Sequence, residues 1–277
     1  MSKKRVDVLL VERGFIETRE KAKRIIMAGL VYTEQERIDK PGIKVEEDIP
    51  LTVKGKLFPY VGRGGLKFEK ALTYFAISAK DKIMIDVGSS TGGFTDCALQ
   101  NGAKLSYAID VGYNQLDWKL RNDQRVIVME RTNFRYVTPD MLAHGQPDLA
   151  SVDVSFISLK LILPVLKKLL KADSNVIILI KPQFEAGKEQ VGKKGIVRDR
   201  GVHFQVLKQI ISFAQSEGYA FKDVTYSPIT GGDGNIEFLA HLSWVNREDC
   251  EPIDEKQLLK LVDDAHNELT IINKKEK

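Results

Sequence analysis

The stretch Ile83-Met-Ile-Asp-Val-Gly-Ser-Ser-Thr-Gly-Gly-Phe-Thr-Asp96 sets the fold class of this chain. Its apolar start, residues 83 to 87, predicts a short buried strand of a parallel sheet, with Asp86 near the carboxyl end. Three glycines follow (Gly88, Gly92 and Gly93), and residues without a Cβ let the backbone turn sharply and approach a ligand closely. We therefore predict a strand, a glycine turn and a helix start, the place where open α/β sheets bind ligands.

The spacing of these glycines indicates which cofactor the turn suits. It differs from the G-x-G-x-x-G pattern that brings a helix N-terminus onto a dinucleotide pyrophosphate. A nicotinamide or flavin cofactor is therefore disfavoured, and S-adenosylmethionine, which has no phosphate, is favoured. At this point the alternative stays open that the glycines serve only a tightly packed turn.

The composition is that of a globular protein with one sizeable α/β core and a small extra module. The chain has 277 residues, of which 43% are hydrophobic and 29% are charged. No apolar run approaches the ~20 residues that a membrane-spanning helix needs, and no cleavage site follows the basic start, so we expect a cytoplasmic protein. Cys97 and Cys250 lack metal spacing, so neither a disulfide nor a metal site is expected.

The rest of the chain after residue 66 alternates short apolar runs with amphipathic segments, which predicts an α/β fold with a Rossmann-like, mostly parallel sheet and an antiparallel last strand. The expected strands are residues 82–87, 104–109, 126–129, 148–152, 175–180, 221–226 and 236–242. The expected helices are residues 68–75, 94–102, 114–121, 158–171, 202–217 and 254–272, the last of them covering the sheet.

Polar side chains follow several of these strands. Asp110 ends the second strand, where a carboxylate can accept hydrogen bonds from both hydroxyls of a ribose, although it could instead cap the next turn. Asp153 follows the fourth strand and Lys181 the fifth. Taken singly, such a lysine can be a surface residue whose alkyl chain covers the sheet.

The first 53 residues predict a separate module of two helices and a small sheet. Residues 5–14 and 18–29 have helical spacing, and short β-like runs follow between residues 30 and 53. The first 24 residues carry eight Lys or Arg against four Asp or Glu. That excess indicates either an electrostatic footprint for nucleic acid or a solvated helix face of mixed charge.

This module resembles an S4 domain, through Arg5-Val-Asp-Val-Leu-Leu-Val-Glu-Arg-Gly14 and Thr18-Arg-Glu-Lys-Ala-Lys-Arg-Ile-Ile-Met-Ala-Gly29. The resemblance implies binding of structured RNA, with basic side chains facing phosphates. The residues expected to contact RNA are Arg5, Arg19, Lys21, Lys23 and Arg24, together with Arg63 on the glycine-bearing loop before the next helix.

The second part resembles the FtsJ-like (RrmJ-like) ribose 2′-O-methyltransferases. The resemblance rests on the loop Asp86-Val-Gly-Ser-Ser-Thr-Gly-Gly-Phe-Thr95, on Ile180-Lys-Pro182, and on a set that matches the family's K-D-K-E tetrad, namely Lys67, Asp153, Lys181 and Glu237, the last placed in the final strand. An S4 domain in front of such a domain is similar to the TlyA family, often called hemolysins. This resemblance implies 2′-O-methylation of cytidines in ribosomal RNA (rRNA).

The resemblance also implies roles for single residues. Lys181 would stabilise the developing alkoxide, Lys67 and Glu237 would position it, and Asp153 would tune its charge. The implied cofactor-binding residues are Asp86, Gly88, Ser89, Thr91, Gly92, Gly93 and Phe94 of the loop, Asp110 for the ribose, and Asn133 with Phe134 for the adenine edge.

The expected organisation is an S4-like domain over residues 1–58, a linker over 59–66 and a methyltransferase domain over 67–277. The linker region reads Phe58-Pro-Tyr-Val61, a point at which members of the family differ. Two rival functions remain: an RNA-binding protein without catalysis, which the complete tetrad disfavours, and a pore-forming hemolysin, which the lack of a long apolar segment disfavours.

Overall fold

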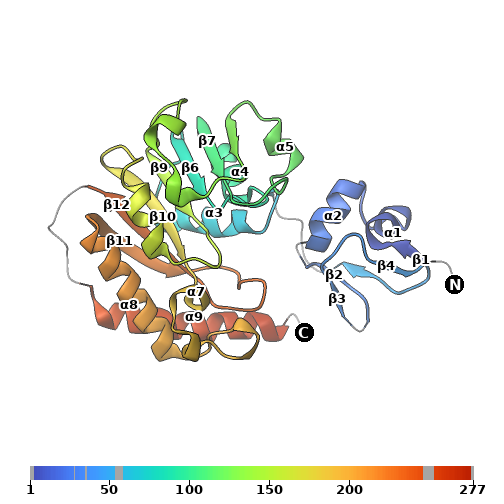
Figure 1. Ribbon diagram of the computed structural model, residues 1–277. Coiled ribbons are helices and arrows are strands. Elements are labelled where there is room, and N and C mark those ends of the chain that lie inside the picture. The colour runs from blue at the N-terminus through green and yellow to red at the C-terminus, as the bar shows by residue number, and fades with distance from the viewer. Residues whose placement is uncertain (1–2, 28, 35, 54–58, 246–252, 276–277) are drawn as a thin grey trace. The chain divides into compact units, whose positions relative to one another are not determined.

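A computed structural model describes residues 3–27, 29–34, 36–53, 59–245 and 253–275 of the chain. Within it the chain forms two compact units, Met1–Arg63 and Gly64–Lys277, each shown in Figure 1. Phe58, the first residue of the stretch Phe58-Pro-Tyr-Val61, and Cys250 lie outside the described residues. Helix α3 begins at Gly64, inside the stretch expected as linker.

The first unit packs two helices against short strands. Its elements are β1 (Lys3–Arg5), α1 (Val6–Glu12), α2 (Arg19–Met27), β2 (Val31–Tyr32), β3 (Arg37–Ile38), β4 (Lys44–Glu46) and β5 (Thr52–Val53). Strands β1 and β4 pair antiparallel, and β3, β2 and β5 form a second small sheet in that order. The hydroxyl of Thr18 accepts a hydrogen bond from the amide of Lys21 (3.2 Å) at the predicted start of α2. Residues 3–5 form a strand before the first helix, which the helical spacing did not predict.

The second unit is built on one seven-stranded sheet. Its strands are β6 (Ile83–Val87), β7 (Leu105–Ile109), β8 (Val126–Met129), β9 (Leu149–Val152), β10 (Ser174–Ile180), β11 (Tyr219–Tyr226) and β12 (Phe238–Trp244). Their order is β11-β12-β10-β9-β6-β7-β8, and all neighbours are parallel except that β12 is antiparallel to both β10 and β11. The predicted α/β fold with a mostly parallel sheet and an antiparallel strand is confirmed. Glu237 lies one residue before β12 and not within the final strand as predicted.

Helices and short 3₁₀ turns connect the strands. The helices are α3 (Gly64–Tyr74), α4 (Gly93–Gln100), α5 (Trp118–Arg121), α6 (Leu163–Leu166), α7 (Pro182–Glu185), α8 (Arg200–Ser216) and α9 (Glu255–Lys275). The 3₁₀ turns are η1 (Phe134–Tyr136), η2 (Pro139–Met141), η3 (Leu159–Leu161), η4 (Lys188–Gln190) and η5 (Lys193–Gly195). Helix α9 packs against β11 and α8 (Figure 1) and buries Leu258, Val262 and Ala265, as predicted.

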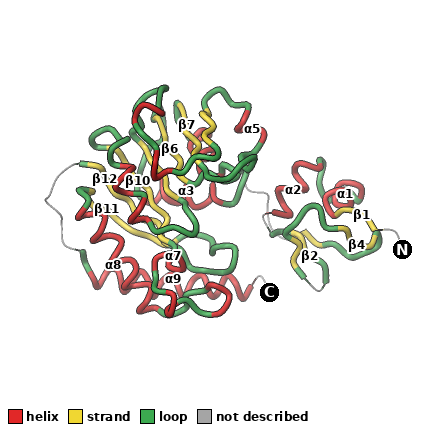
Figure 2. Tube along the Cα trace, in the orientation of Figure 1, coloured by secondary structure: helices red, strands yellow, loops and turns green. Residues whose placement is uncertain are grey.

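Two predicted helices are much shorter than expected. The amides of Gln115 and Leu116 donate to the carboxylate of Glu130 and not to carbonyls of a preceding turn, so only Trp118–Arg121 is helical, and Figure 2 shows loop around α5. Between residues 158 and 171, Pro164 lacks a backbone N–H, and the segment divides into η3 and α6.

The core of the second unit lies on the faces of its sheet. The central strands β9 and β10 are buried on both faces, which is why they read as continuous apolar runs. Because β6, β7, β8, β9 and β10 are parallel, their carboxyl ends lie at one edge of the sheet. That edge carries Asp86, Asp110, Asp153 and Lys181.

Candidate active site

The structure brings the four predicted tetrad residues together as a chain of alternating charges. The Nζ atom of Lys67, on α3, lies 2.6 Å from Oε2 of Glu237 and 3.8 Å from Oδ2 of Asp153. The Nζ atom of Lys181 lies 2.5 Å from Oδ1 of Asp153. Asp153 thus lies between two ammonium groups, and Glu237 is the last member of this series of charged side chains.

These four side chains are largely shielded from water. The side chains of Lys67, Lys181 and Glu237 are 9%, 10% and 3% exposed, and that of Asp153 is 18% exposed. Burial alone would raise the pKa of Asp153, but the charges of Lys67 and Lys181 outweigh burial and lower it. Asp153 therefore stays an anion at neutral pH and keeps both lysines in place.

A second set of side chains, absent from the predicted site, surrounds Lys181. The Nζ atom of Lys181 donates to Oγ of Ser155 (3.0 Å) and lies 5.8 Å from the ring centroid of Phe184. The ring of Phe156 lies 4.9 Å from that of Phe184, yet Phe156 is 90% exposed and has a positive φ of 62°. Phe156 belongs to an irregular loop. The sequence periodicities that mark strands and helices therefore could not single it out.

Glu185 holds these two loops together. Its carboxylate accepts hydrogen bonds from Oγ of Ser158 (2.7 Å) and from the amide of Leu159 (2.8 Å). These hydrogen bonds hold the segment after β9 against the helix after β10, next to the tetrad. The positions of Asp153 and Lys181 consequently depend on a contact between residues 26 or 27 positions apart in the chain.

The glycine loop after β6 approaches the tetrad through its backbone. Gly88 has a φ of +83°, and a Cβ atom there would overlap the carbonyl oxygen of Asp153. Gly92 also has a positive φ, and a Cβ there would overlap Leu120. Gly93 and Phe94 begin α4, and Phe94 packs against Phe68 with ring centroids 5.2 Å apart.

Asp86 lies beneath this loop. It is 1% exposed, and its carboxylate accepts hydrogen bonds from Oγ1 of Thr95 (2.7 Å), from the Thr95 amide (3.2 Å) and from Oγ of Ser151 (2.7 Å). Burial raises the pKa of Asp86 to about 6, against the opposing effect of these hydrogen bonds. In this arrangement Asp86 supports the loop and the start of α4 from below.

The remaining predicted cofactor residues lie along the same edge. The two oxygens of Asp110 accept hydrogen bonds from the amides of Ser90 (2.8 Å) and Gly112 (2.7 Å). Asn133 caps η1 through the amide of Arg135, and Phe134 is 4% exposed within the core. Ser89 is 7% exposed and Thr91 is half-buried.

This edge fits S-adenosylmethionine on two observations. The backbone of Gly88 lies so close to the backbone of Asp153 that a Cβ atom would not fit, which fixes the glycine loop at the carboxyl end of β6. The carboxylate of Asp110 accepts one amide hydrogen on each oxygen, and each oxygen keeps lone pairs for a ribose hydroxyl. Gly88 and Asp110 are therefore the residues that would hold such a cofactor.

In the first unit, the predicted RNA-binding residues are paired with acids. Arg5 forms a bidentate contact with Asp7 (2.9 and 3.0 Å), and Arg19 reaches the same carboxylate (3.0 Å). Asp7 is fully buried, and the hydrogen bond from Arg5 is the largest effect that lowers its pKa to about 2, against burial. Lys21 pairs with Glu17, and Lys23 with Glu20 at 2.7 Å.

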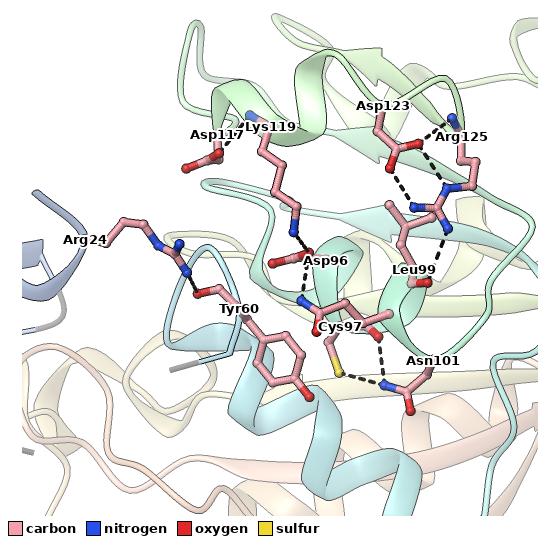
Figure 3. A network of polar contacts seen from close by, with 11 residues as sticks. Arg24, Tyr60, Asp96, Cys97, Leu99, Asn101, Asp117, Lys119, Asp123 and Arg125 are labelled. Atoms are coloured by element: carbon pink, nitrogen blue, oxygen red, sulfur yellow. Dashed lines mark hydrogen bonds and ion pairs between the residues drawn. The ribbon is translucent and has the colours of Figure 1, made fainter. Parts of the chain in front are cut away.

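The other two predicted RNA-binding residues are Arg24, on α2, and Arg63, at the end of this unit. Figure 3 shows the guanidinium of Arg24 donating to the carbonyl of Tyr60 (2.5 Å). Arg63 is half-buried and directly precedes α3. Contact of these six basic residues with RNA stays a prediction.

Comparison with known proteins gives the family. The FtsJ-like methyltransferase family matches residues 60–244, and the S4 domain family matches residues 4–48. YqxC of Bacillus subtilis, provisionally named an rRNA methyltransferase, is 64% identical over 96% of this chain and 95% of its own. The 16S/23S rRNA (cytidine-2′-O)-methyltransferase TlyA of Mycobacterium tuberculosis is 41% identical over 86% of this chain and 89% of its own.

A solved structure agrees over the whole chain. A protein from Streptococcus thermophilus, provisionally described as a hemolysin, has a TM-score of 0.79 and 52% identity, and the match covers 99% of both chains. In the part of this chain that the structure describes, no helix is long and apolar enough to cross a membrane. On the family match and these relatives, the chain belongs to the TlyA family of FtsJ-like methyltransferases that carry an amino-terminal S4 domain.

Proposed function

We propose that this chain is a cytoplasmic enzyme that transfers a methyl group from S-adenosylmethionine to the ribose 2′-hydroxyl of cytidines in rRNA. The observation that carries the proposal is the chain of contacts Glu237–Lys67–Asp153–Lys181, beside a glycine loop that fits the cofactor. The names of the relatives support rRNA as the substrate class.

When bound, S-adenosylmethionine supplies an electrophilic methyl group on a sulfonium. The residues of the chain then have to orient a ribose hydroxyl, which is a weak nucleophile at neutral pH, and stabilise the charge that develops on its oxygen. The hydroxyl proton passes to water, and the bond broken is the one between the methyl group and the sulfonium sulfur, which becomes a neutral thioether. Lys181 is suited to this, because its ammonium is held by Asp153 and Ser155 before substrate binds. Loss of one such preorganised donor typically costs about 3 kcal/mol of transition-state stabilisation.

The other members of the tetrad act through position and charge. Asp153 remains ionised between two lysines and keeps Lys181 at the carboxyl end of β10. Lys67, paired with Glu237, holds Oδ2 of Asp153, the carboxylate oxygen that does not contact Lys181. We therefore assign direct contact with the reacting oxygen to Lys181 and positioning to Lys67 and Glu237.

Phe156 offers a platform for the target base. Its ring is 90% exposed and is held near that of Phe184. Phe156 also directly follows Ser155, whose hydroxyl contacts Lys181, so the ring lies close to the reacting centre. An unstacked base next to the target ribose can stack on such an exposed aromatic ring.

In the first unit, we propose that the basic helix α2 docks rRNA. The exposed pairs Lys21–Glu17 and Lys23–Glu20 are screened by water and contribute little to stability, so phosphates can replace the acids at little cost. Arg5 and Arg19 are held side by side by the buried carboxylate of Asp7, which orients both guanidinium groups.

The proposal is tested by incubating the purified protein with labelled S-adenosylmethionine and separated ribosomal subunits, and then mapping 2′-O-methyl groups in the rRNA. Label in cytidine 2′-O-methyl positions is the expected result. An RNA-binding protein without catalysis would bind the subunits and leave them unlabelled. A hemolysin would instead release the contents of red blood cells or lipid vesicles without labelling rRNA.

A further inference from the structure

Two neighbouring loops of the second unit present exposed aromatic rings together with arginines. The loop after β7 carries Tyr113, 64% exposed, and leads to Trp118, 75% exposed. The segment after β8 carries Arg131, Arg135 and Tyr136, and Tyr136 is 72% exposed. We call these five residues the arginine–tyrosine surface. None of them belongs to the predicted tetrad or cofactor residues, and Arg135 contacts that set through its amide and Nε, which both donate to Oδ1 of Asn133.

The loop that carries Tyr113 is held against Arg131 by contacts within the protein. The amide of Arg131 donates to the carbonyl of Gly112 (2.9 Å), so the two loops continue the pairing of β7 with β8. Glu130 fixes the first loop, because its carboxylate accepts from the amides of Gln115 (3.0 Å) and Leu116 (3.4 Å) and from the guanidinium of Arg121 (2.6 Å).

Helix α5 is also fixed by a contact with α4 and by its own N-terminal cap. The Nζ atom of Lys119 lies 3.1 Å from Oδ1 of Asp96 on α4, and the side chain of Asp117 caps α5 through the amide of Lys119 (Figure 3). Trp118 lies between these two anchored residues. Its exposure therefore belongs to a fixed turn and not to a loose chain end.

The chemistry of the surface matches a nucleic acid strand. The guanidinium of Arg131 lies 4.0 Å from the ring centroid of Tyr113, and that of Arg135 lies 5.6 Å from that of Tyr136. Such stacked pairs can receive a base on the ring and a phosphate on the guanidinium. In residues 59–245, where Arg121 and Arg125 are paired with acids, neither Arg131 nor Arg135 forms an ion pair with a carboxylate.

The position of the surface fits the same substrate. Strands β7 and β8 are parallel to β9 and β10, so their carboxyl ends lie at the sheet edge that carries Asp153 and Lys181. A single-stranded segment of RNA that places a ribose at Lys181 can continue along this edge. The wide exposure of three aromatic rings, which water solvates poorly, is also typical of a surface that stacks with bases.

We propose that the arginine–tyrosine surface binds a single-stranded rRNA segment that flanks the methylated nucleotide, by stacking of bases and by contacts of Arg131 and Arg135 with phosphates. This inference rests on the proposed function and adds to it a second RNA-binding surface, on the catalytic unit. The protein should therefore select an unpaired region of the rRNA, since bases within a duplex cannot stack on protein rings.

The test uses the full chain and a fluorescent single-stranded RNA of cytidines and uridines, about ten nucleotides long, the size range that such surfaces cover. Tyr113→Ala and Tyr136→Ala should each weaken binding about 5-fold to 150-fold, whereas Tyr113→Phe and Tyr136→Phe, which keep the rings, should bind like wild type. Arg131→Ser with Arg135→Ser should lower the slope of log affinity against log salt by about 0.7 for each phosphate that the variant no longer binds.

Lys104→Ser is the matched control, because Lys104 is an exposed cation at the opposite end of β7. It should change neither affinity nor slope. Thermal unfolding of every variant checks the fold. Calorimetry with S-adenosylmethionine should give the wild-type affinity for the tyrosine and arginine variants.

Three results would overturn the inference. Weakened S-adenosylmethionine binding with unchanged RNA binding would make the surface a cover of the cofactor. Weakened binding of ribosomal subunits with unchanged RNA binding would make it a contact with ribosomal protein. Wild-type behaviour in all assays would make it solvated surface. Methylation of subunits by the wild-type protein, measured in parallel, tests the proposed function separately from this surface.

Discussion

At the scale of single residues, the site depends on which charge each lysine contacts. Lys67 and Lys181 share Asp153, but only Lys67 also has Glu237. Lys181 has a hydroxyl, that of Ser155, as its other partner. Lys181 is therefore the cation whose charge is less fully neutralised by neighbouring carboxylates, which is the reason to expect it to act on substrate.

The membership of this group could be predicted from the sequence, because Lys67, Asp153 and Lys181 adjoin a recognisable strand or helix and all four residues match a family motif. The pairing could not be predicted, since distances such as the 2.6 Å between Lys67 and Glu237 join residues 170 positions apart. Ser155 and Phe156 gave no signal, because irregular loops have no periodicity.

Asp86 gives a prediction about stability and pH. Its pKa is raised from 3.8 to about 6 in the folded chain, so its protonated form favours the fold. The contribution of Asp86 to the free energy of unfolding is fully present below pH 3.8 and is lost as the pH rises through 6. Between these two limits the free energy of unfolding changes by about 3 kcal/mol. Asp86→Asn, which is neutral at every pH, should therefore be more favourable relative to wild type at pH 7.5 than at pH 4.5.

Chemical denaturation at the two pH values, followed by circular dichroism, measures this difference in the free energy of unfolding. Asp140→Asn, on the exposed turn η2, is the control for the removal of a carboxylate that is not buried. The same effect of Asp86→Asn at both pH values would mean that burial does not raise the pKa of this carboxyl.

At the scale of elements, the glycine loop after β6 is the most constrained connection. Gly88→Ala adds a Cβ that overlaps the backbone of Asp153 at a positive φ, where strain costs about 1 to 3 kcal/mol. We expect weaker binding of S-adenosylmethionine and a lower melting temperature.

Gly232→Ala is the matched control, since no atom lies within 4 Å of a Cβ there. It should change the melting temperature little and leave the cofactor affinity intact. Calorimetry and thermal unfolding measure the two quantities. Wild-type binding and stability in Gly88→Ala would show that the loop can move away from Asp153.

The strands were more predictable than the helices. Runs such as Val176 to Ile180 are apolar because both faces of the sheet are covered, and that pattern is visible in the sequence. The shortening of the predicted helix at residues 114–121 was not visible, because it depends on hydrogen bonds to Glu130 on another element. The local helix propensity was overridden there by a carboxylate that is distant in the sequence but close in space.

At the scale of the whole molecule, the chain has two separate cores. Val6, Leu10, Ile25 and Ile26 belong to a cluster of the first unit alone, while the second unit has its own cluster around the sheet. Each unit can therefore be examined for its own activity.

A protein of residues 64–277 should stay folded and bind S-adenosylmethionine with wild-type affinity, because its core and glycine loop are intact. Its affinity for ribosomal subunits should fall strongly, since the basic helix α2 is removed. Filter binding and calorimetry measure the two affinities. Unchanged binding of the subunits would show that the first unit does not dock the substrate.

The proposed mechanism depends above all on Lys181, which is expected to stabilise the charge that develops on the ribose oxygen. The decisive quantity is the single-turnover rate of methyl transfer to ribosomal subunits by Lys181→Ala, at saturating cofactor and RNA. We predict a rate lower by about 10²-fold to 10³-fold, with near-normal affinity for subunits, no rescue by Lys181→Arg, and a smaller loss in Glu237→Gln. A Lys181→Ala protein that methylates rRNA at the wild-type rate would contradict this role of the lysine.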